Sequence, residues 1–358
     1  MLDVYELSTN KGREKYKSLL SSLDAVEPYY LLDYIDIFSS GFENLICFSF
    51  SNNKTGATII MPGYLKPVII GEEKTSCLDF ITPYGYTGPL SATSASMADI
   101  TEFWSEVDNW YKKNDVVSEF IRFNLSDNHL NYSGAIVQTM LNVKGDIIDE
   151  DLQWTSFDHK VRKNANKAKR ENLTCEVYFK NIEEERIKEF FGIYISTMQR
   201  TNAAPHFFYS FDDFKRFISS NQKNAAICTV YFENKPVASE LLLVSEETIY
   251  SFLGGTDEAY FDKRPNDFLK VAAINWARNQ SIKYYVLGGG YGFEDGIFNY
   301  KKSFFPNNVV NYYTGRKIIN SAVYDELIEK SNVVRSASGL SELNKEDVSF
   351  FPLYNKSN

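Results

Sequence analysis

The sequence predicts a mixed α/β (α+β) protein made of two similar halves, each a mostly antiparallel sheet flanked by helices. The 358 residues are 44% apolar and 15% aromatic, so the chain is long enough for two domains with separate cores. Helical periodicity alternates with short β-rich runs along the chain. The order of these segments in the first half recurs in the second half, as expected of a duplicated unit.

In the first half, the pattern predicts two helices, a group of strands, a helix and a strand. Helical spacing occurs in 12–23 and 31–42, and short β-rich runs occupy 44–51, 56–65 and 74–81. Residues 98–115 then form an amphipathic helix, whose apolar stripe consists of Ile100, Phe103, Trp104, Val107 and Trp110. Residues 116–124 predict a strand, and we expect the first domain to span residues 1–150.

The second half repeats this order. Helices are predicted over 181–200 and 210–221, three consecutive strands within 225–255, a helix over 264–280, a strand over 282–290, a helix over 295–305 and a strand over 308–319. We therefore expect a second domain over residues 151–358.

Charge and cysteine content disfavour several function classes. The chain has 47 acidic and 38 basic residues, a net charge of −9, which disfavours a globally basic nucleic-acid binder. The four cysteines are scattered without a CxxC spacing, so we predict small core residues rather than zinc ligands, and no metal. No stretch has the length and apolarity of a signal peptide or a membrane span, so we expect a cytoplasmic protein.

The densest basic segment lies between the two halves. It contains Lys160, Arg162, Lys163, Lys167, Lys169 and Arg170. The segment is either a solvated connecting helix or a surface that faces phosphate groups, and the residues alone leave both interpretations open.

Four stretches together resemble the Fem-type branch of the GNAT superfamily. They are PYGYTGPL (83–90), KVRKNANKAKRENLTCEV (160–177), RPNDFLKVAAINWA (264–277) and GGGYGFEDGIFNYKKSFFP (288–306). This branch carries two GNAT folds in tandem, and it includes peptidoglycan aminoacyl transferases and N-acyltransferases that modify amino sugars for surface polysaccharides. The resemblance implies an N-terminal GNAT-like domain and a C-terminal GNAT domain with the acyl-donor site.

The resemblance also implies where an acyl-CoA donor binds. A GNAT unit splays two neighbouring strands, the pantetheine lies in the gap, and the pyrophosphate meets the N-terminus of the following helix. The corresponding stretch, GGTDEAYFDKRPNDFLK, lacks the usual R/Q-x-x-G-x-G/A signature. The expected donor-binding residues are Gly254, Gly255, Lys263, Arg264, Asn266 and Lys270. The alternative is an ordinary capped helix with solvated lysines.

Two further stretches are expected to contact the acceptor. Tyr84 and Tyr86 lie in a rigid turn, where their rings and hydroxyls suit a nucleotide-linked sugar. Arg200 matches a family arginine near the acceptor phosphates, and His206 and Tyr209 follow it in a loop. Packed tyrosines and a surface histidine are the structural alternative.

Glu240 and Lys301 are the predicted catalytic residues. Glu240 interrupts the apolar strand PVASELLLV, where an unpaired glutamate is rare, and GNAT enzymes often place a general base on such a strand. The resemblance implies that Lys301 stabilises charge on the acyl carbonyl, although Lys302 beside it leaves that choice open. No Ser/His/Asp or Cys/His arrangement supports an acyl-enzyme.

Three functions fit these residues. The first is a CoA-dependent N-acyltransferase that acts on a nucleotide-linked amino sugar, such as a dTDP-amino-dideoxyhexose, by direct attack. The second is an aminoacyl-tRNA-dependent peptidoglycan transferase, which the acidic composition disfavours. The third is an inactive double-GNAT binding module. The glycine run Gly288 to Gly290 lacks the lysine-serine ending of a P-loop, so we do not expect a nucleotide loop there. In the CoA-dependent function, these glycines would let the backbone pass close to the thioester of the donor.

Overall fold

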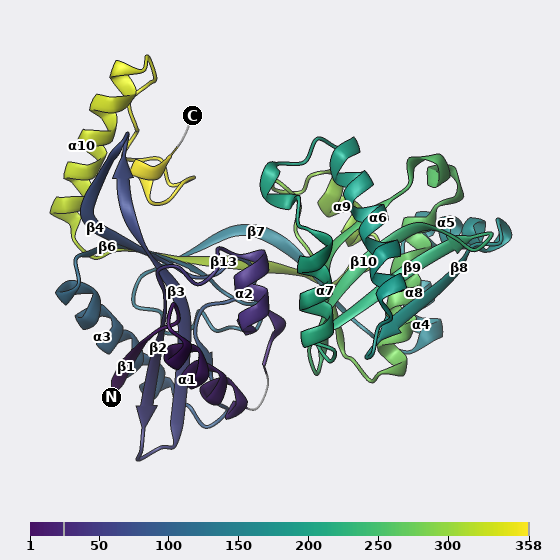
Figure 1. Ribbon diagram of the computed structural model, residues 1–358, viewed down its shortest axis with the longest axis horizontal. Helices are drawn as coiled ribbons and strands as arrows, with labels where there is room; N and C mark the ends of the chain where they lie inside the picture. The colour runs from purple at the N-terminus through teal and green to yellow at the C-terminus, as the bar shows by residue number, and fades with distance from the viewer. Residues whose placement is uncertain (24–25, 357–358) are drawn as a thin grey trace. The chain divides into compact units, whose positions relative to one another are not determined.

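The computed structural model describes residues 1–23 and 26–356, and the chain divides into two compact units (Figure 1). The first unit consists of residues 1–139 and 312–358, and the second unit of residues 140–311. The predicted class is confirmed: each unit is a mixed sheet flanked by helices. Within the described residues, no helix combines the length and apolar composition needed to cross a bilayer.

The sheet of the first unit has the order β1-β2-β3-β4-β6-β13 and is antiparallel except for the parallel pair β4–β6. Its strands are β1 (Leu2–Glu6), β2 (Leu45–Asn52), β3 (Ala57–Ile70), β4 (Glu73–Ile81), β6 (Val116–Arg122) and the end of β13 (Val309–Ile318), while β5 (Leu90–Ser91) pairs with β3. Its helices are α1 (Asn10–Ser21), η1 (Pro28–Tyr30), α2 (Leu32–Phe38), α3 (Met97–Lys113), α10 (Ser321–Ala337) and η4 (Leu353–Asn355). The aromatic side chains of α3 pack on one face of this sheet, and α10 packs on the other.

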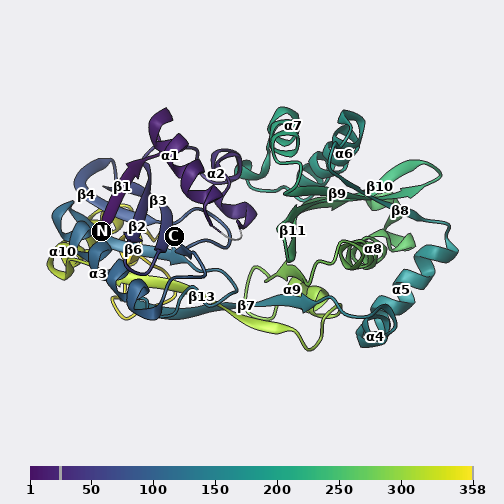
Figure 2. The ribbon, with the colours of Figure 1, turned by 90° about the horizontal axis from the view of Figure 1, so that it is seen from below.

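The sheet of the second unit has the order β7-β12-β11-β10-β9-β8, with β11–β12 as its parallel pair. Its strands are β7 (Ala135–Asp146), β8 (Thr174–Phe179), β9 (Ala225–Phe232), β10 (Lys235–Val244), β11 (Thr248–Thr256) and β12 (Tyr284–Gly288). Its helices are α4 (Glu150–Ser156), α5 (His159–Arg170), α6 (Glu184–Arg200), η2 (Pro205–Phe207), α7 (Phe211–Ser220), η3 (Glu258–Lys263), α8 (Pro265–Asn279) and α9 (Gly296–Lys302). Helices α6 and α7 cover one face, and α5 and α8 cover the other (Figure 2).

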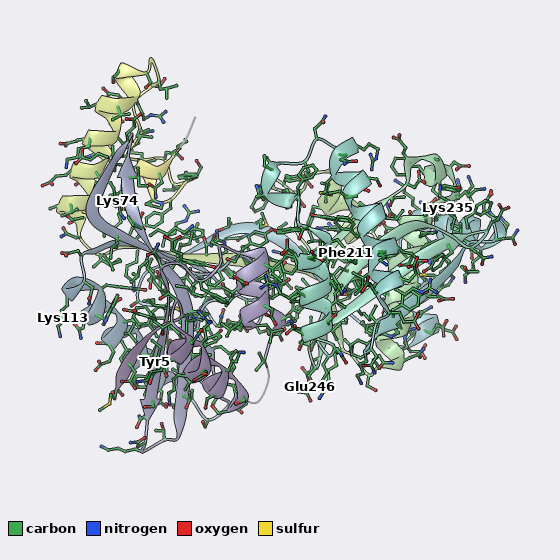
Figure 3. The ribbon with its side chains drawn as sticks, in the orientation of Figure 1. Tyr5, Lys74, Lys113, Phe211, Lys235 and Glu246 are labelled. Carbon is green, nitrogen blue, oxygen red and sulfur yellow. The ribbon has the colours of Figure 1, made fainter. Side chains whose placement is uncertain are left out.

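Local sequence signals fix the ends of several helices. Helix α7 begins at Phe211, which is labelled in Figure 3, because Ser210 and Asp213 form a capping box. Ser96 and Asp99 do the same for α3. These caps satisfy backbone N–H groups that a helix start otherwise leaves without partners.

Two strands pair away from their neighbours in sequence. β7 follows β6 along the chain but pairs with β12, whereas β13 follows β12 but pairs with β6. The chain therefore passes between the units within β7 and again within β13. For this reason the bounds of the compact units differ from the predicted domains 1–150 and 151–358, since the C-terminal segment packs with the first unit.

Candidate active site in the second unit

The parallel strands β11 and β12 separate after a short paired stretch. They pair only from Thr248 to Tyr250 on β11, opposite 284–286 on β12. β11 continues to Thr256 with β10 as its partner strand, and a bulge between the two leaves Phe252 as an extra residue. The edge of β11 beyond Tyr250 therefore has no pairing with β12, which is the arrangement expected for a GNAT donor site.

A buried polar network lies where the strands part; we call Glu240, Ser251, Lys270 and Tyr285 the Glu240 network. The Glu240 carboxylate, 7% exposed, accepts hydrogen bonds from Ser251 Oγ at 2.5 Å and from Lys270 Nζ at 2.5 Å. It also accepts one from Tyr285 OH at 3.1 Å. Lys270 Nζ donates in addition to Ser251 Oγ at 2.8 Å and to Tyr285 OH at 3.2 Å. The strands β10, β11 and β12 and the helix α8 thus each contribute one polar side chain.

Lys270, which was expected to bind the donor near the start of α8, instead directs its ammonium into the Glu240 network. Its ion pair with Glu240 is buried, with side-chain exposures of 11% and 9%. A buried carboxylate is stable only when it is paired and hydrogen-bonded, so Lys270 explains how the apolar strand β10 accommodates Glu240.

Lys301 on α9 is electrostatically coupled to the Glu240 network. Its Nζ donates to the carbonyl oxygen of Gly289 at 2.6 Å. The pKa of Lys301 falls to about 8, chiefly because of burial; the positive charge of Lys270 contributes to the fall, while Glu240 opposes it. This coupling favours Lys301 over Lys302 as the lysine that acts at the site.

The glycine run after β12 is explained by packing within the unit. Gly288 has a φ of +79°, a conformation that favours glycine. A Cβ on Gly289 would lie 2.7 Å from the oxygen of Leu141, and one on Gly290 would lie 2.0 Å from Asp295 Oδ1. Asp295 in turn caps α9 by accepting from the N–H of Phe298 at 2.8 Å. The run therefore holds the start of α9 close to β12 and β7.

The predicted phosphate-binding residues at the start of α8 already have partners. Lys263 Nζ lies 2.9 Å from Glu171 Oε2. Asn266 Oδ1 accepts from Thr256 Oγ1 at 2.5 Å, and Arg264 adopts a left-handed conformation as the residue before the helix. The first turn of α8 thus offers fewer free polar groups than the sequence predicts.

A buried carboxylate that the sequence analysis missed also lies in this turn. Asp267 is 8% exposed and accepts from Asn164 Nδ2 at 3.1 Å. Burial raises the pKa of Asp267, while the hydrogen bond from Asn164 and the charges of Arg264 and Lys160 oppose that shift. The basic helix α5 therefore lies beside the start of α8, and both interpretations of the basic segment stay open.

Gly254 and Gly255 permit close packing around β11. A Cβ on Gly254 would lie 2.7 Å from the oxygen of Ser239 on β10. A Cβ on Gly255 would lie 2.2 Å from Thr197 Oγ1 on α6. Both glycines lie on the part of β11 beyond its pairing with β12, and they let β10 and α6 approach β11 closely.

The remaining predicted residues do not join the Glu240 network. Arg200 lies over the ring of Phe261 at 5.1 Å, with Glu258 4.0 Å away. His206 is exposed in η2, and the ring of Tyr209 is edge-on to another ring of the same unit. Arg200 is the last residue of α6, and His206 and Tyr209 lie in the segment that follows it.

Tyr84 and Tyr86 belong to the first unit. Tyr84 is 58% exposed, and its carbonyl accepts from Tyr34 OH at 3.2 Å. The ring of Tyr86 packs edge-on between those of Tyr29 and Tyr312, at 5.3 and 5.7 Å. Of the two, Tyr84 presents its side chain outward.

Three polar residues of the site were missed by the sequence analysis: Ser251, Tyr285 and Tyr300. Among the described residues, Tyr300 Oη is a buried side-chain oxygen with no hydrogen-bond partner. Burial raises the pKa of Tyr300, and the negative charges of Asp267 and Glu240 raise it further. An unpartnered buried hydroxyl needs an explanation, and a bound ligand would supply one. In sequence, its only signal is its position directly before Lys301.

Comparisons with known proteins agree with this geometry. Residues 156–302 match the family model described as an acetyltransferase (GNAT) domain. A crystal structure of FemX is similar with a TM-score of 0.62 and 10% identity, covering 87% of this chain and 97% of that chain. L-PGS from Bacillus licheniformis is similar with a TM-score of 0.57 and 13% identity, covering 92% and 98%. A sequence comparison with curated proteins gives no significant match.

Proposed function

Because residues 156–302 form a GNAT acetyltransferase domain within a Fem-type tandem GNAT fold, we propose that the protein is a CoA-dependent N-acyltransferase. The proposed acceptor is the amino group of a nucleotide-linked amino sugar, such as a dTDP-amino-dideoxyhexose. The reaction takes place in the cytoplasm in this proposal, and its product is used to synthesise surface polysaccharide. One observation supports the proposal: β11 and β12 stop pairing after Tyr250, and the Glu240 network lies where they part.

Glu240 is the general base of the proposed reaction. The amine nitrogen attacks the thioester carbonyl, so that a C–N bond forms and the C–S bond breaks. The Glu240 carboxylate accepts the proton that the amine loses. Lys270, Ser251 and Tyr285 are positioning residues, since their hydrogen bonds fix the carboxylate.

Two groups on α9 stabilise charge in this proposal. The ammonium of Lys301 donates a hydrogen bond to the oxyanion that develops on the acyl carbonyl. The hydroxyl of Tyr300, which has no partner among the described residues, donates a proton to the leaving sulfur. After the products leave, Tyr300 regains a proton from water and Glu240 releases its proton to water, which restores both groups. The acyl group passes directly from CoA to the amine, without an acyl-enzyme.

A thermal-shift screen tests the donor and acceptor classes. A ligand that binds only the native state raises the melting temperature, so CoA and a dTDP- or UDP-linked amino sugar should each raise it. Glu240→Gln should keep the shift with CoA, because Glu240 acts on the amine. No shift with any of these ligands, together with binding of charged tRNA, would replace the proposal with an aminoacyl-tRNA-dependent transfer.

A further inference from the structure

Two cysteines of the second unit hold their sulfur atoms in contact. Cys175 lies on β8 and Cys228 on β9, both as free thiols, and their Sγ atoms are 3.5 Å apart. In the antiparallel register, Cys228 lies opposite Val177, two residues beyond Cys175, so the cysteines are diagonal neighbours on one face of the sheet. They are 53 positions apart in the chain, so the fold brings them together and the sequence spacing does not reveal the contact.

The two thiols differ in their access to solvent. Cys228 is 0% exposed in the core of the unit, whereas Cys175 is half-buried at the margin of that core. β8 is the edge strand of the sheet, and its partner strand among the described residues is β9 (Figure 1). The hydrogen bond with Cys175 and burial both raise the pKa of the Cys228 thiol. A small oxidant in solution therefore reaches the Cys175 sulfur first.

Cys228 also lies beside the Glu240 network. It is directly opposite Glu240 in the pairing of β9 with β10, and opposite residues point to the same face. Its Sγ donates to the carbonyl oxygen of Leu269 at 3.7 Å, and Leu269 directly precedes Lys270 on α8. The Cys228 sulfur is therefore packed between β8, the strand that carries the proposed base and the helix that carries its lysine partner.

We propose that Cys175 and Cys228 form a redox modification site, the Cys175–Cys228 dithiol, which a peroxide converts to a disulfide. Hydrogen peroxide oxidises the Cys175 thiol to a sulfenic acid, and one water leaves. The Cys228 sulfur then attacks the sulfenic sulfur, so that an S–S bond forms, the S–O bond breaks and a second water leaves. The two thiols together lose two electrons and two hydrogens, and the peroxide takes up both.

The disulfide would alter the packing beside the Glu240 network. Its two sulfur atoms must approach from 3.5 Å to about 2 Å, and β8 can shift toward β9 because it is paired on one side only. The Cys228 sulfur then moves off the carbonyl of Leu269 and displaces its neighbours around Glu240 and Lys270. A loss of turnover on oxidation rests on the proposed function, whereas formation of the disulfide does not.

Intact-mass measurement of the folded full chain after treatment with hydrogen peroxide tests the modification. Wild type should remain a monomer and lose about 2 Da, and a reductant should restore its mass. Digestion should then yield a peptide pair joined through Cys175 and Cys228. Cys175→Ser should show no such loss, whereas Cys228→Ala should keep a sulfenic acid on Cys175 that dimedone traps. Cys77→Ser is the matched control, because Cys77 is a half-buried cysteine of the first unit, and it should behave as wild type.

Three results of this experiment would overturn the proposal. They are oxidation of wild type without the loss of two hydrogens, a disulfide that joins other cysteines, and the same loss in Cys175→Ser. Because Cys175 is half-buried on an edge strand, Cys175→Ser should fold normally even if Cys228→Ala does not.

Turnover with acetyl-CoA and a dTDP- or UDP-linked amino sugar tests the link to the Glu240 network. Oxidised wild type should turn over about 10- to 100-fold more slowly than reduced wild type, since a small displacement of reacting groups has an effect of this size. The same peroxide treatment should leave the turnover of Cys175→Ser unchanged. Equal turnover of oxidised and reduced wild type would overturn the link. No turnover in the reduced protein would instead contradict the proposed function, and the mass measurement would still decide whether the dithiol forms a disulfide.

Discussion

At the scale of single residues, we expect the Glu240–Lys270 pair to affect both stability and, under the proposed function, activity. Glu240→Gln leaves the Lys270 ammonium buried without its counter-charge, so we expect the free energy of unfolding to fall by about 3–5 kcal/mol. Loss of the base should lower turnover by about 10²- to 10⁴-fold. Urea unfolding and steady-state assays measure the two effects.

The double variant Glu240→Gln/Lys270→Met separates these effects. It removes both charges, so it should recover much of the lost stability while turnover stays low. Recovery of turnover in the double variant would show that Glu240 is not the base.

Lys301 predicts how stability depends on pH. Its pKa falls from the usual 10.5 to about 8 in the folded protein, chiefly because of burial. Between these two values the unfolded chain binds more protons than the folded chain, so the contribution of Lys301 to stability rises with pH from about 8 to about 10.5. The full rise is about 3 kcal/mol. Below pH 8 the buried ammonium destabilises the fold by a constant amount.

Urea unfolding of wild type and Lys301→Met between pH 7 and pH 10.5 measures this rise. Subtracting one stability curve from the other removes the other titrating groups, which the two proteins share. Parallel curves would mean that Lys301 titrates alike in the folded and unfolded states.

At the scale of elements, α6 packs closely on β11 in the part of the strand that is not paired with β12. A Cβ on Gly255 would lie 2.2 Å from Thr197 Oγ1 and 2.7 Å from the oxygen of Ile193. We expect Gly255→Ala to destabilise the protein by about 1–3 kcal/mol, because α6 must shift. In contrast, a Cβ on Gly192 of α6 has no atom within 4 Å, so Gly192→Ala should stabilise by about 0.5–1 kcal/mol. Equal urea midpoints for the two variants would contradict this account.

Elements and buried positions could largely be predicted from the sequence, because local periodicity reports which side chains are buried. Helix α3 lies within two residues of its predicted bounds, and Glu240 is buried in a strand as predicted. The partner of each element could not be predicted. Lys270 was expected at phosphates because it lies one turn into α8, but the packing of α8 directs it to Glu240. The pairing of β7 with β12 and of β13 with β6 likewise depends on contacts between segments that are distant in sequence.

At the scale of the whole molecule, the two units share a topology but differ at their parallel strand pairs. In the first unit, β4 and β6 stay paired from Leu78 to Ile81, the last residue of β4. In the second unit, β11 extends from Ser251 to Thr256 beyond its pairing with β12. Among the described residues, only the second unit thus has a parallel pair that parts in this way, so under the proposed function we expect calorimetry to give one CoA per chain. Two equivalent CoA sites would contradict this difference between the units.

In the proposed function the acyl group passes directly from acyl-CoA to an amine, and a single-turnover experiment with intact-mass detection tests this step. Excess enzyme is mixed with acetyl-CoA, and a dTDP- or UDP-linked amino sugar is then added. We expect that CoA is released only after the amino sugar arrives, that the sugar gains the acetyl group, and that the protein mass never changes. An acetylated protein, or no acetyl transfer while charged tRNA serves as the donor, would contradict it.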